Sequence, residues 1–295
     1  MALVESNGIE ISYESFGRRS DPAVLLVSGF TSQLLGWDEA LCGALAKSGL
    51  RVIRFDNRDV GLTTKTAGPA PDVVAMFTAL MTGKEIAPPP YTLADMAKDG
   101  IGLLDALGVR AAHVVGMSMG GMIVQQMAID HPSRVLSVTS VMSTTGDTAV
   151  GKATPAAQQA LLRPPSADKE QYLNDSVESS RVISGLLFEE EYRRTRLTLS
   201  YERSYYPTGA AFQMAAIASG GDRTEALRKL DVPTLVIHGR ADSLVQLSGG
   251  EATAAAVPHA QLIVFNDMGH DLPPPLFPAY VDAIGAHVRR VEAAR

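Results

Sequence analysis

The segment Gly116-Met117-Ser118-Met119-Gly120 limits the fold more than any other feature of the sequence. It directly follows the short run His113-Val114-Val115, and an apolar helical pattern continues from Met119 to Ile129. A serine between two glycines at such a junction is typical of a nucleophile elbow, a tight strand-to-helix turn that projects the serine Oγ above a sheet. Glycines on both sides remove side-chain clashes in that turn. We therefore expect Ser118 at the end of a buried strand, with an ordinary strand-helix turn as the alternative.

Composition and charge exclude several classes of protein. The chain has 295 residues, of which 46% are hydrophobic and 20% charged, as in an ordinary globular enzyme. Its net charge of -6 offers no basic surface for nucleic acid. Cys42 is the only cysteine, so an intrachain disulfide cannot form. The segment from Met1 to Tyr13 lacks the pattern of a secretory signal, and no segment is apolar for long enough to span a bilayer. We therefore expect a cytoplasmic protein without integral membrane association.

Short β-branched or aliphatic runs alternate with longer helical patterns along the chain. This alternation indicates an α/β fold with a mostly parallel central sheet flanked by helices. The expected strands are Ile11 to Phe16, Val24 to Ser28, Arg51 to Phe55, His113 to Met117, Val135 to Val141, Thr234 to His238 and Leu262 to Phe265. The expected core helices are Asp38 to Lys47, Thr92 to Leu107, Met119 to Asp130, Val245 to Ala256 and Pro278 to Val291. Thr92, three residues before Asp95, is the expected N-cap of its helix.

The alternation stops between Val141 and Thr234, where roughly ninety residues contain no convincing central strand, far more than an ordinary connection. The expected helices there are Ala156 to Leu162, Asp168 to Ser180, Glu189 to Tyr201 and Gly209 to Ala218. We expect residues 143–231 to form an inserted helical cap, with 1–142 and 232–295 as the two parts of the core. Ligands of open α/β sheets bind at the carboxyl ends of the strands, so the cap is expected over that edge. A second domain without a catalytic role is the alternative.

Two further residues complete a candidate catalytic group with Ser118. A serine hydroxyl needs a base to accept its proton, and a histidine base needs a carboxylate to fix its tautomer. Asp242 follows the expected strand Thr234 to His238, and His270 follows the last expected strand. All three residues then lie after the carboxyl ends of strands, where they can converge. Asp147, which also follows an expected strand, is the main alternative for the acid.

Ester cleavage also needs N–H groups aimed at the developing oxyanion. The backbone N–H after the nucleophile, here that of Met119, is the first expected donor. The second is expected from an early loop after an apolar strand, where Gly29 lets the chain turn close to the substrate and the N–H of Phe30 donates. The segment Asp56 to Gly61 follows another strand and is expected to brace the site through hydrogen bonds rather than to react.

These motifs resemble the α/β-hydrolase superfamily and, within it, a group of bacterial serine esterases that includes aclacinomycin methylesterase. The residues that carry the resemblance are Leu35-Gly36-Trp37, Arg54 to Gly61, His113 to Gly121, Val232 to Gly239 with Asp242, and Gly269-His270. The order serine, acid, histidine along the chain is also the order of that superfamily. The resemblance implies Ser118 as nucleophile, Asp242 as acid, His270 as base, and Phe30 and Met119 as oxyanion donors. One departure is Ser28-Gly29, where many relatives have His-Gly before the oxyanion residue.

We therefore expect a serine hydrolase that cleaves small to medium apolar carboxylic esters through an acyl-enzyme on Ser118, without metal or organic cofactor. The expected substrate-binding residues are Trp37, Met117, Met142 and Tyr206, although such apolar side chains also fill ordinary cores. The same triad would suit a lactonase, a thioesterase or a perhydrolase. A ligand-binding sensor with slow turnover is the alternative from another class. The expected partner is a small-molecule ester, not nucleic acid, and a homodimer is left open.

Overall fold

The computed structural model describes residues 1–82, 84 and 88–295 and places eight of their strands in one sheet. The strands are β1 (Ala2–Ser6), β2 (Ile9–Phe16), β3 (Ala23–Val27), β4 (Arg51–Phe55), β5 (Ala112–Met117), β6 (Val135–Val141), β7 (Thr234–Gly239) and β8 (Gln261–Phe265). Their order is β1-β2-β4-β3-β5-β6-β7-β8. The pairs β1–β2 and β2–β4 are antiparallel, and all other pairs are parallel. The predicted α/β class and mostly parallel sheet are confirmed.

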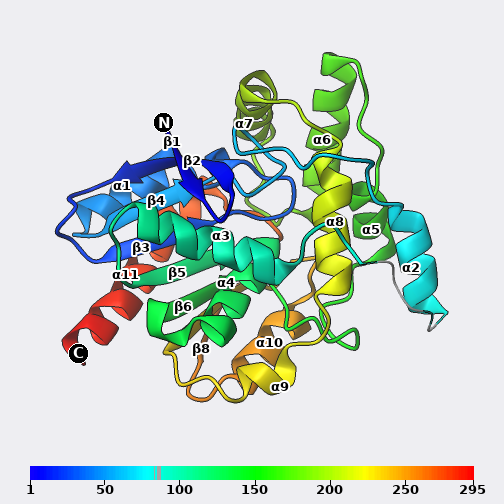
Figure 1. Cartoon of the computed structure of the whole chain (residues 1–295). Coiled ribbons are helices and arrows are strands. Elements are labelled where there is room, and N and C mark those ends of the chain that lie inside the picture. Colours follow the sequence, from blue (N-terminus) through cyan, green and yellow to red (C-terminus); the bar gives the residue numbers. More distant parts are fainter. Residues whose placement is uncertain (83, 85–87) are drawn as a thin grey trace.

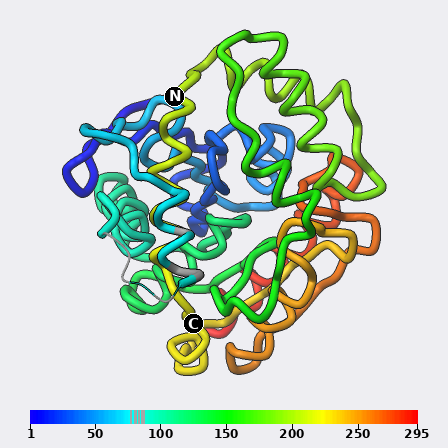
Figure 2. The backbone as a smooth tube through the Cα atoms, turned by 90° about the vertical axis from the view of Figure 1, so that its right-hand side faces the viewer, coloured from blue at the N-terminus to red at the C-terminus, as the bar shows by residue number. Residues whose placement is uncertain are grey.

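Helices cover this sheet and also fill the long connection between β6 and β7. The α-helices are α1 (Glu39–Lys47), α2 (Val73–Met81), α3 (Leu93–Ala106), α4 (Met119–Asp130), α5 (Pro155–Leu161), α6 (Lys169–Ile183), α7 (Glu190–Arg203), α8 (Gly209–Ser219), α9 (Thr224–Leu227), α10 (Leu247–Ala256) and α11 (Phe277–Ala293). All predicted helices are present, and Thr92 caps α3 in a capping box with Asp95. Two helices were not predicted from the sequence: α2, which packs against α8 (Figure 2), and the short α9.

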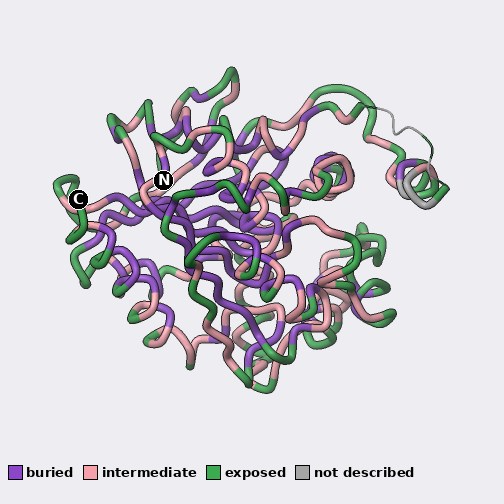
Figure 3. The backbone as a smooth tube through the Cα atoms, turned by 90° about the horizontal axis from the view of Figure 1, so that it is seen from below, coloured by how far each residue is buried: buried purple, intermediate pink, exposed green. Residues whose placement is uncertain are grey.

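The core lies on both faces of the sheet. Strands β3, β4, β5 and β7 are buried along their whole length, and the buried backbone gathers at the centre of the molecule (Figure 3). One apolar cluster joins one face to α3 and α4, including Leu25, Met96 and Ile123. A second joins the other face to α1 and α11, including Leu26 and Tyr280. Burial on both faces explains why β3 is apolar at every residue. No helix among the described residues is long and apolar enough to cross a membrane.

The helices between β6 and β7 gather beyond one end of the sheet. Figure 1 shows α5, α6, α7 and α8 on the side away from the C-terminus. Hydrogen bonds tie this helical group to loops at the carboxyl ends of strands. The carbonyl of Ile183, at the end of α6, accepts from the N–H of His270 after β8, and Gln213 in α8 accepts from the N–H of Thr31 after β3. The group therefore covers the edge of the sheet at which the strands end.

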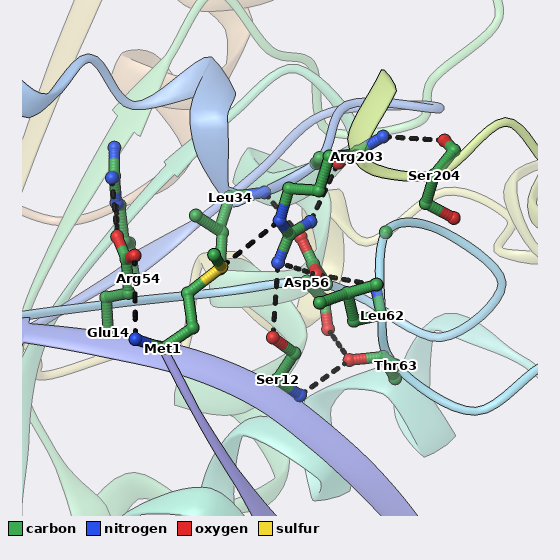
Figure 4. A network of polar contacts seen from close by, with 12 residues as sticks. Met1, Ser12, Glu14, Leu34, Arg54, Asp56, Leu62, Thr63, Arg203 and Ser204 are labelled. Atoms are coloured by element: carbon green, nitrogen blue, oxygen red, sulfur yellow. Dashed lines mark hydrogen bonds and ion pairs between the residues drawn. The ribbon is translucent and has the colours of Figure 1, made fainter. Parts of the chain in front are cut away.

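A buried ion pair fastens α7 to the core (Figure 4). The guanidinium of Arg203, the last residue of α7, lies 2.8 Å from the carboxylate of Asp56, which follows β4. The Arg203 side chain is 8% exposed and that of Asp56 is fully buried. Arg203 also donates to Gln33 Oε1, and Asp56 accepts from the backbone N–H groups of Leu34 and Leu62. Both charges therefore have partners, as burial requires.

Replacing Arg203 by methionine is expected to lower the free energy of unfolding by about 3 kcal/mol, because Asp56 would stay buried without its counter-charge. Urea denaturation followed by circular dichroism measures this change. The matched control is Arg194→Met in the same helix. The Arg194 guanidinium is more exposed than that of Arg203, and its distance to the Glu170 carboxylate is longer, at 4.0 Å. That exposed pair is expected to contribute less than about 1 kcal/mol. Equal losses in the two variants would contradict a stabilising role of the buried pair.

Candidate active site

Ser118 occupies a sharp turn between β5 and α4. Its backbone has φ 55° and ψ -121°, a conformation that L-residues rarely adopt. The turn depends on the two glycines of the motif. A Cβ at Gly116 would overlap the carbonyl of Gly120, and a Cβ at Gly120 would overlap the carbonyl of Val27 in β3. The strand-to-helix elbow predicted from the sequence is therefore present, and it has no room for larger residues at either glycine.

Replacing Gly120 by alanine is expected to lower the free energy of unfolding by about 2 kcal/mol, because overpacked sites must move backbone to make room. The new methyl group would meet the carbonyls of Val27 and Ser28, which lead into the neighbouring loop. Gly43 provides a matched control, since it lies inside α1 and a Cβ there meets no atom within 4 Å. Gly43→Ala is expected to raise stability by about 0.5 to 1 kcal/mol. Chemical denaturation of both variants checks the two signs, and a Gly120→Ala protein as stable as wild type would contradict the account of the elbow.

Ser118, His270 and Asp242 form one chain of hydrogen bonds. Nε2 of His270 lies 2.9 Å from Ser118 Oγ, and Nδ1 lies 2.8 Å from Asp242 Oδ2. The other carboxylate oxygen of Asp242 accepts from the N–H groups of Leu244 and Val245 at 2.9 and 2.8 Å. Asp242 is buried, and Ser118 is partly exposed. With its proton on Nδ1, His270 can therefore accept the serine proton while the fixed carboxylate stabilises the resulting cation.

The other candidates for acid and base lie differently. Asp147 accepts from the N–H of Ala149, and no hydrogen bond joins it to His270 in the described part of the chain. His238 is fully buried in β7, with Nε2 3.6 Å from Asp242 Oδ2. That nitrogen lies 2.7 Å from the carbonyl of Val245 and donates to it. Burial lowers the pKa of His238, so this neighbour of the acid stays neutral near pH 7.

The loop after β3 runs directly against the serine elbow. A Cβ at Gly29 would stand 3.3 Å from Ser118 Cβ and 3.2 Å from the carbonyl of Met117. Among the described residues, the N–H groups of Phe30 and Met119 have no hydrogen-bond acceptor, so both are available as donors. Ser28 is buried and donates from Oγ to the carbonyl of Gln33 at 3.2 Å. Ser28 therefore stabilises the loop from within.

Hydrogen bonds from the next strand brace this loop, as the sequence predicts for the segment Asp56 to Gly61. Asn57 Nδ2 donates to the carbonyl of Ser28 at 2.9 Å, and Asp56 accepts from the N–H of Leu34 at 2.7 Å. These bonds hold both ends of the loop.

Three of the four residues expected to bind substrate lie in one buried cluster, and Tyr206 lies elsewhere. Trp37, Met117 and Met142 belong to the buried cluster under α1 and α11, where each is less than a tenth exposed. Tyr206 is half-buried in the segment before α8, and the ammonium of Lys65 lies 5.5 Å from its ring centre. Of the four, Met117 directly precedes Ser118 and Met142 follows the end of β6.

The loop that carries His270 rests on the helical group through bare backbone. A Cβ at Gly269 would overlap the backbone of Ser184 and Gly185, and a Cβ at Gly185 would overlap the carbonyl of Asp267. Asp271 accepts from the N–H of Gly269 at 3.1 Å and so shapes the turn. Burial raises the pKa of Asp271. No side chain of larger size fits between the histidine loop and the end of α6.

No group of three or more His, Cys, Asp or Glu side chains that could hold a metal ion occurs in the described ranges 1–82, 84 and 88–295. The chemistry available from the site's described side chains is therefore a hydroxyl, an imidazole and a carboxylate in sequence, next to two free backbone donors.

Comparisons with known proteins agree with the fold. The chain is 26% identical to rhodomycin D methylesterase DauP of Streptomyces sp. (strain C5), and the alignment covers 97% of each protein. It is also 26% identical to rhodomycin D methylesterase DnrP of Streptomyces peucetius, again over 97% of each. A meta-cleavage product hydrolase from Pseudomonas fluorescens IP01 shares the fold, with a TM-score of 0.77 over 98% of each chain at 20% identity. The resemblance to this bacterial esterase group is confirmed. A model of the alpha/beta hydrolase fold matches residues 22–273, so the chain belongs to the α/β-hydrolase family.

Proposed function

We propose that this chain is a serine hydrolase that cleaves carboxylic esters through an acyl-enzyme on Ser118. The observation that carries the proposal is the position of His270, whose two ring nitrogens lie 2.9 Å from Ser118 Oγ and 2.8 Å from Asp242 Oδ2. A base placed between the nucleophile and a buried acid is the arrangement that activates a serine hydroxyl. Family membership and the two methylesterase relatives support ester hydrolysis as the general activity.

The geometry supports a two-step reaction. Ser118 Oγ attacks the ester carbonyl while His270 Nε2 takes the hydroxyl proton, and Asp242 stabilises the imidazolium. The oxyanion of the tetrahedral intermediate accepts from the N–H groups of Phe30 and Met119. The intermediate then collapses, and His270 returns the proton to the leaving alcohol. In the second step His270 takes a proton from water, the hydroxide attacks the acyl carbonyl, and the acid leaves as Ser118 regains its proton.

The helices between β6 and β7 cover the proposed site. We propose residues 143–231 as the cap and 1–142 with 232–295 as the core. The contacts of Ile183 with His270 and of Gln213 with Thr31 support this position over the catalytic loops. Small to medium apolar esters are the proposed substrates, and a methyl ester belongs among them because two relatives are methylesterases. A cytoplasmic location and a homodimer stay predictions.

Labelling and turnover with the wild-type protein test the proposal. A fluorophosphonate is expected to label Ser118 stoichiometrically, as peptide mass spectrometry detects, because it traps an activated serine through its oxyanion site. A series of p-nitrophenyl esters from acetate to decanoate, together with methyl esters, is expected to give many turnovers and a maximum at short to medium acyl chains. Labelling of another residue would overturn Ser118 as the nucleophile. A single turnover from a folded protein would overturn the proposed esterase activity and favour a ligand-binding sensor. Turnover of thioesters or lactones without turnover of esters would show that the substrate belongs to one of those classes instead.

A further inference from the structure

The loop that carries the proposed oxyanion donor Phe30 is held from two opposite sides. From the core, Asn57 Nδ2 donates to the carbonyl of Ser28 at 2.9 Å. From the cap, Gln213 Oε1 accepts the N–H of Thr31 at 2.8 Å. Thr31 has φ +56°, in the left-handed region that a threonine rarely adopts. A strained residue persists only where its surroundings fix it, and such residues concentrate at functional sites. Gln213 is one of the groups that fix Thr31.

Gln213 is a fully buried amide in the middle of α8. Its Nε2 donates to the carbonyl of Arg58 at 2.9 Å, so both ends of the amide have partners. Burying a polar group is costly unless its hydrogen bonds are made, and an apolar side chain of the same size would pack there without this requirement. The two bonds of Gln213 join one cap helix to the loops after β3 and β4, at the carboxyl ends of two neighbouring parallel strands.

We propose that Gln213 is a positioning residue of the oxyanion hole, and that the hole is complete only while α8 is docked on the core. The proposal rests on the function proposed above. Holding the N–H of Thr31 fixes the plane of the peptide between Phe30 and Thr31, and with it the turn that directs the preceding N–H of Phe30 toward the substrate. The cap over the site therefore also fixes the position of one oxyanion donor, the N–H of Phe30.

Replacing Gln213 by methionine keeps the size of the side chain and removes both hydrogen bonds. The expected result is a fall in kcat of about 10- to 100-fold with KM changed less than about twofold, because a donor displaced by a fraction of an ångström stabilises the transition state less. The affinity for a trifluoromethyl ketone, which forms a tetrahedral adduct, is expected to fall by a similar factor. Gln125→Met is the matched control, since Gln125 is equally buried in α4 and hydrogen-bonds to Ser140 and Arg223. It is expected to lose stability while kcat per folded molecule is kept.

Gln213→Glu gives a second, isosteric test. A protonated carboxyl can accept from Thr31 and donate to Arg58 as the amide does, whereas the carboxylate cannot donate. The ratio of its kcat to that of wild type is therefore expected to be near one at low pH and to fall as pH rises. A ratio that stays well below one at every pH, or a Gln213→Met enzyme with wild-type kcat and inhibitor affinity, overturns the positioning role. Fluorophosphonate labelling of Ser118 in wild type decides the underlying function separately, so the two failures are distinguishable.

Discussion

Replacing Ser118 by alanine is expected to lower kcat for p-nitrophenyl acetate by about a million-fold, the loss seen when the nucleophile of a serine triad is removed. The alanine has no group that His270 can activate, since only the Oγ lies 2.9 Å from Nε2. The residual rate comes from the oxyanion donors and from substrate binding alone. The fold is expected to survive because alanine adds no atom to the turn between β5 and α4.

Steady-state rates of wild type and Ser118→Ala, purified in parallel, measure this effect. Thermal unfolding of both proteins controls for damage to the elbow, since only a folded variant makes the comparison meaningful. A folded Ser118→Ala protein that hydrolyses the ester at more than about a hundredth of the wild-type rate would contradict nucleophilic catalysis by this serine, because neither water activation nor binding alone reaches that level.

Replacing Asp242 by asparagine is expected to lower kcat by about ten-thousand-fold, because the amide favours the wrong tautomer of the histidine and does not stabilise its cation. The change is nearly isosteric, and an amide oxygen can still accept from the N–H groups of Leu244 and Val245. The local turn is therefore expected to keep its shape, while the hydrogen bond between the side chain at position 242 and His270 Nδ1 is altered.

Asp147→Asn serves as the matched control for the acid. Asp147 was the alternative acid from the sequence, and its carboxylate accepts from the N–H of Ala149. Its replacement is expected to change kcat by less than about twofold, in line with a surface substitution away from the reacting groups. The opposite pattern, with activity lost in Asp147→Asn and kept in Asp242→Asn, would exchange the two assignments.

Local patterns in the sequence predict most of the core. Parallel strands buried on both faces have continuous apolar runs that are easy to recognise, such as Val24 to Val27 and Leu235 to Ile237. All seven predicted strands are present. The strand β1 was missed because Ala2–Ser6 is short and mostly exposed, at the edge of the sheet. The dipeptide Asn7-Gly8, where both residues have positive φ, was the signal for a hairpin that could have revealed it.

Some residues of the site can be predicted from local sequence patterns, and others only from the packing of distant segments. Glycine spacing and strand ends predict where Ser118, Asp242 and His270 lie, and the structure joins them in one hydrogen-bonded chain, while their catalytic roles stay predictions. Gln213 and Arg203 could not be assigned from the sequence, because each is one polar residue in a helix whose partner lies far away in the chain. Only the packing of α7 and α8 against the loops after β3 and β4 makes such pairs.

The contact between Gly185 and Gly269 bears on how enzymes of this kind can be recombined. Backbone meets backbone there, with no side chain that could adjust, at the base of the loop that holds His270. A chimera that takes the helices between β6 and β7 from another protein would have to keep this backbone contact. Even one added methyl group there would displace His270. Exchange of these helices is thus constrained at this contact, and also at Gln213 and Arg203, whose side chains reach the core. Graft junctions that keep residues 183–185 and these two side chains native leave the other residues of the insertion open to redesign of substrate preference.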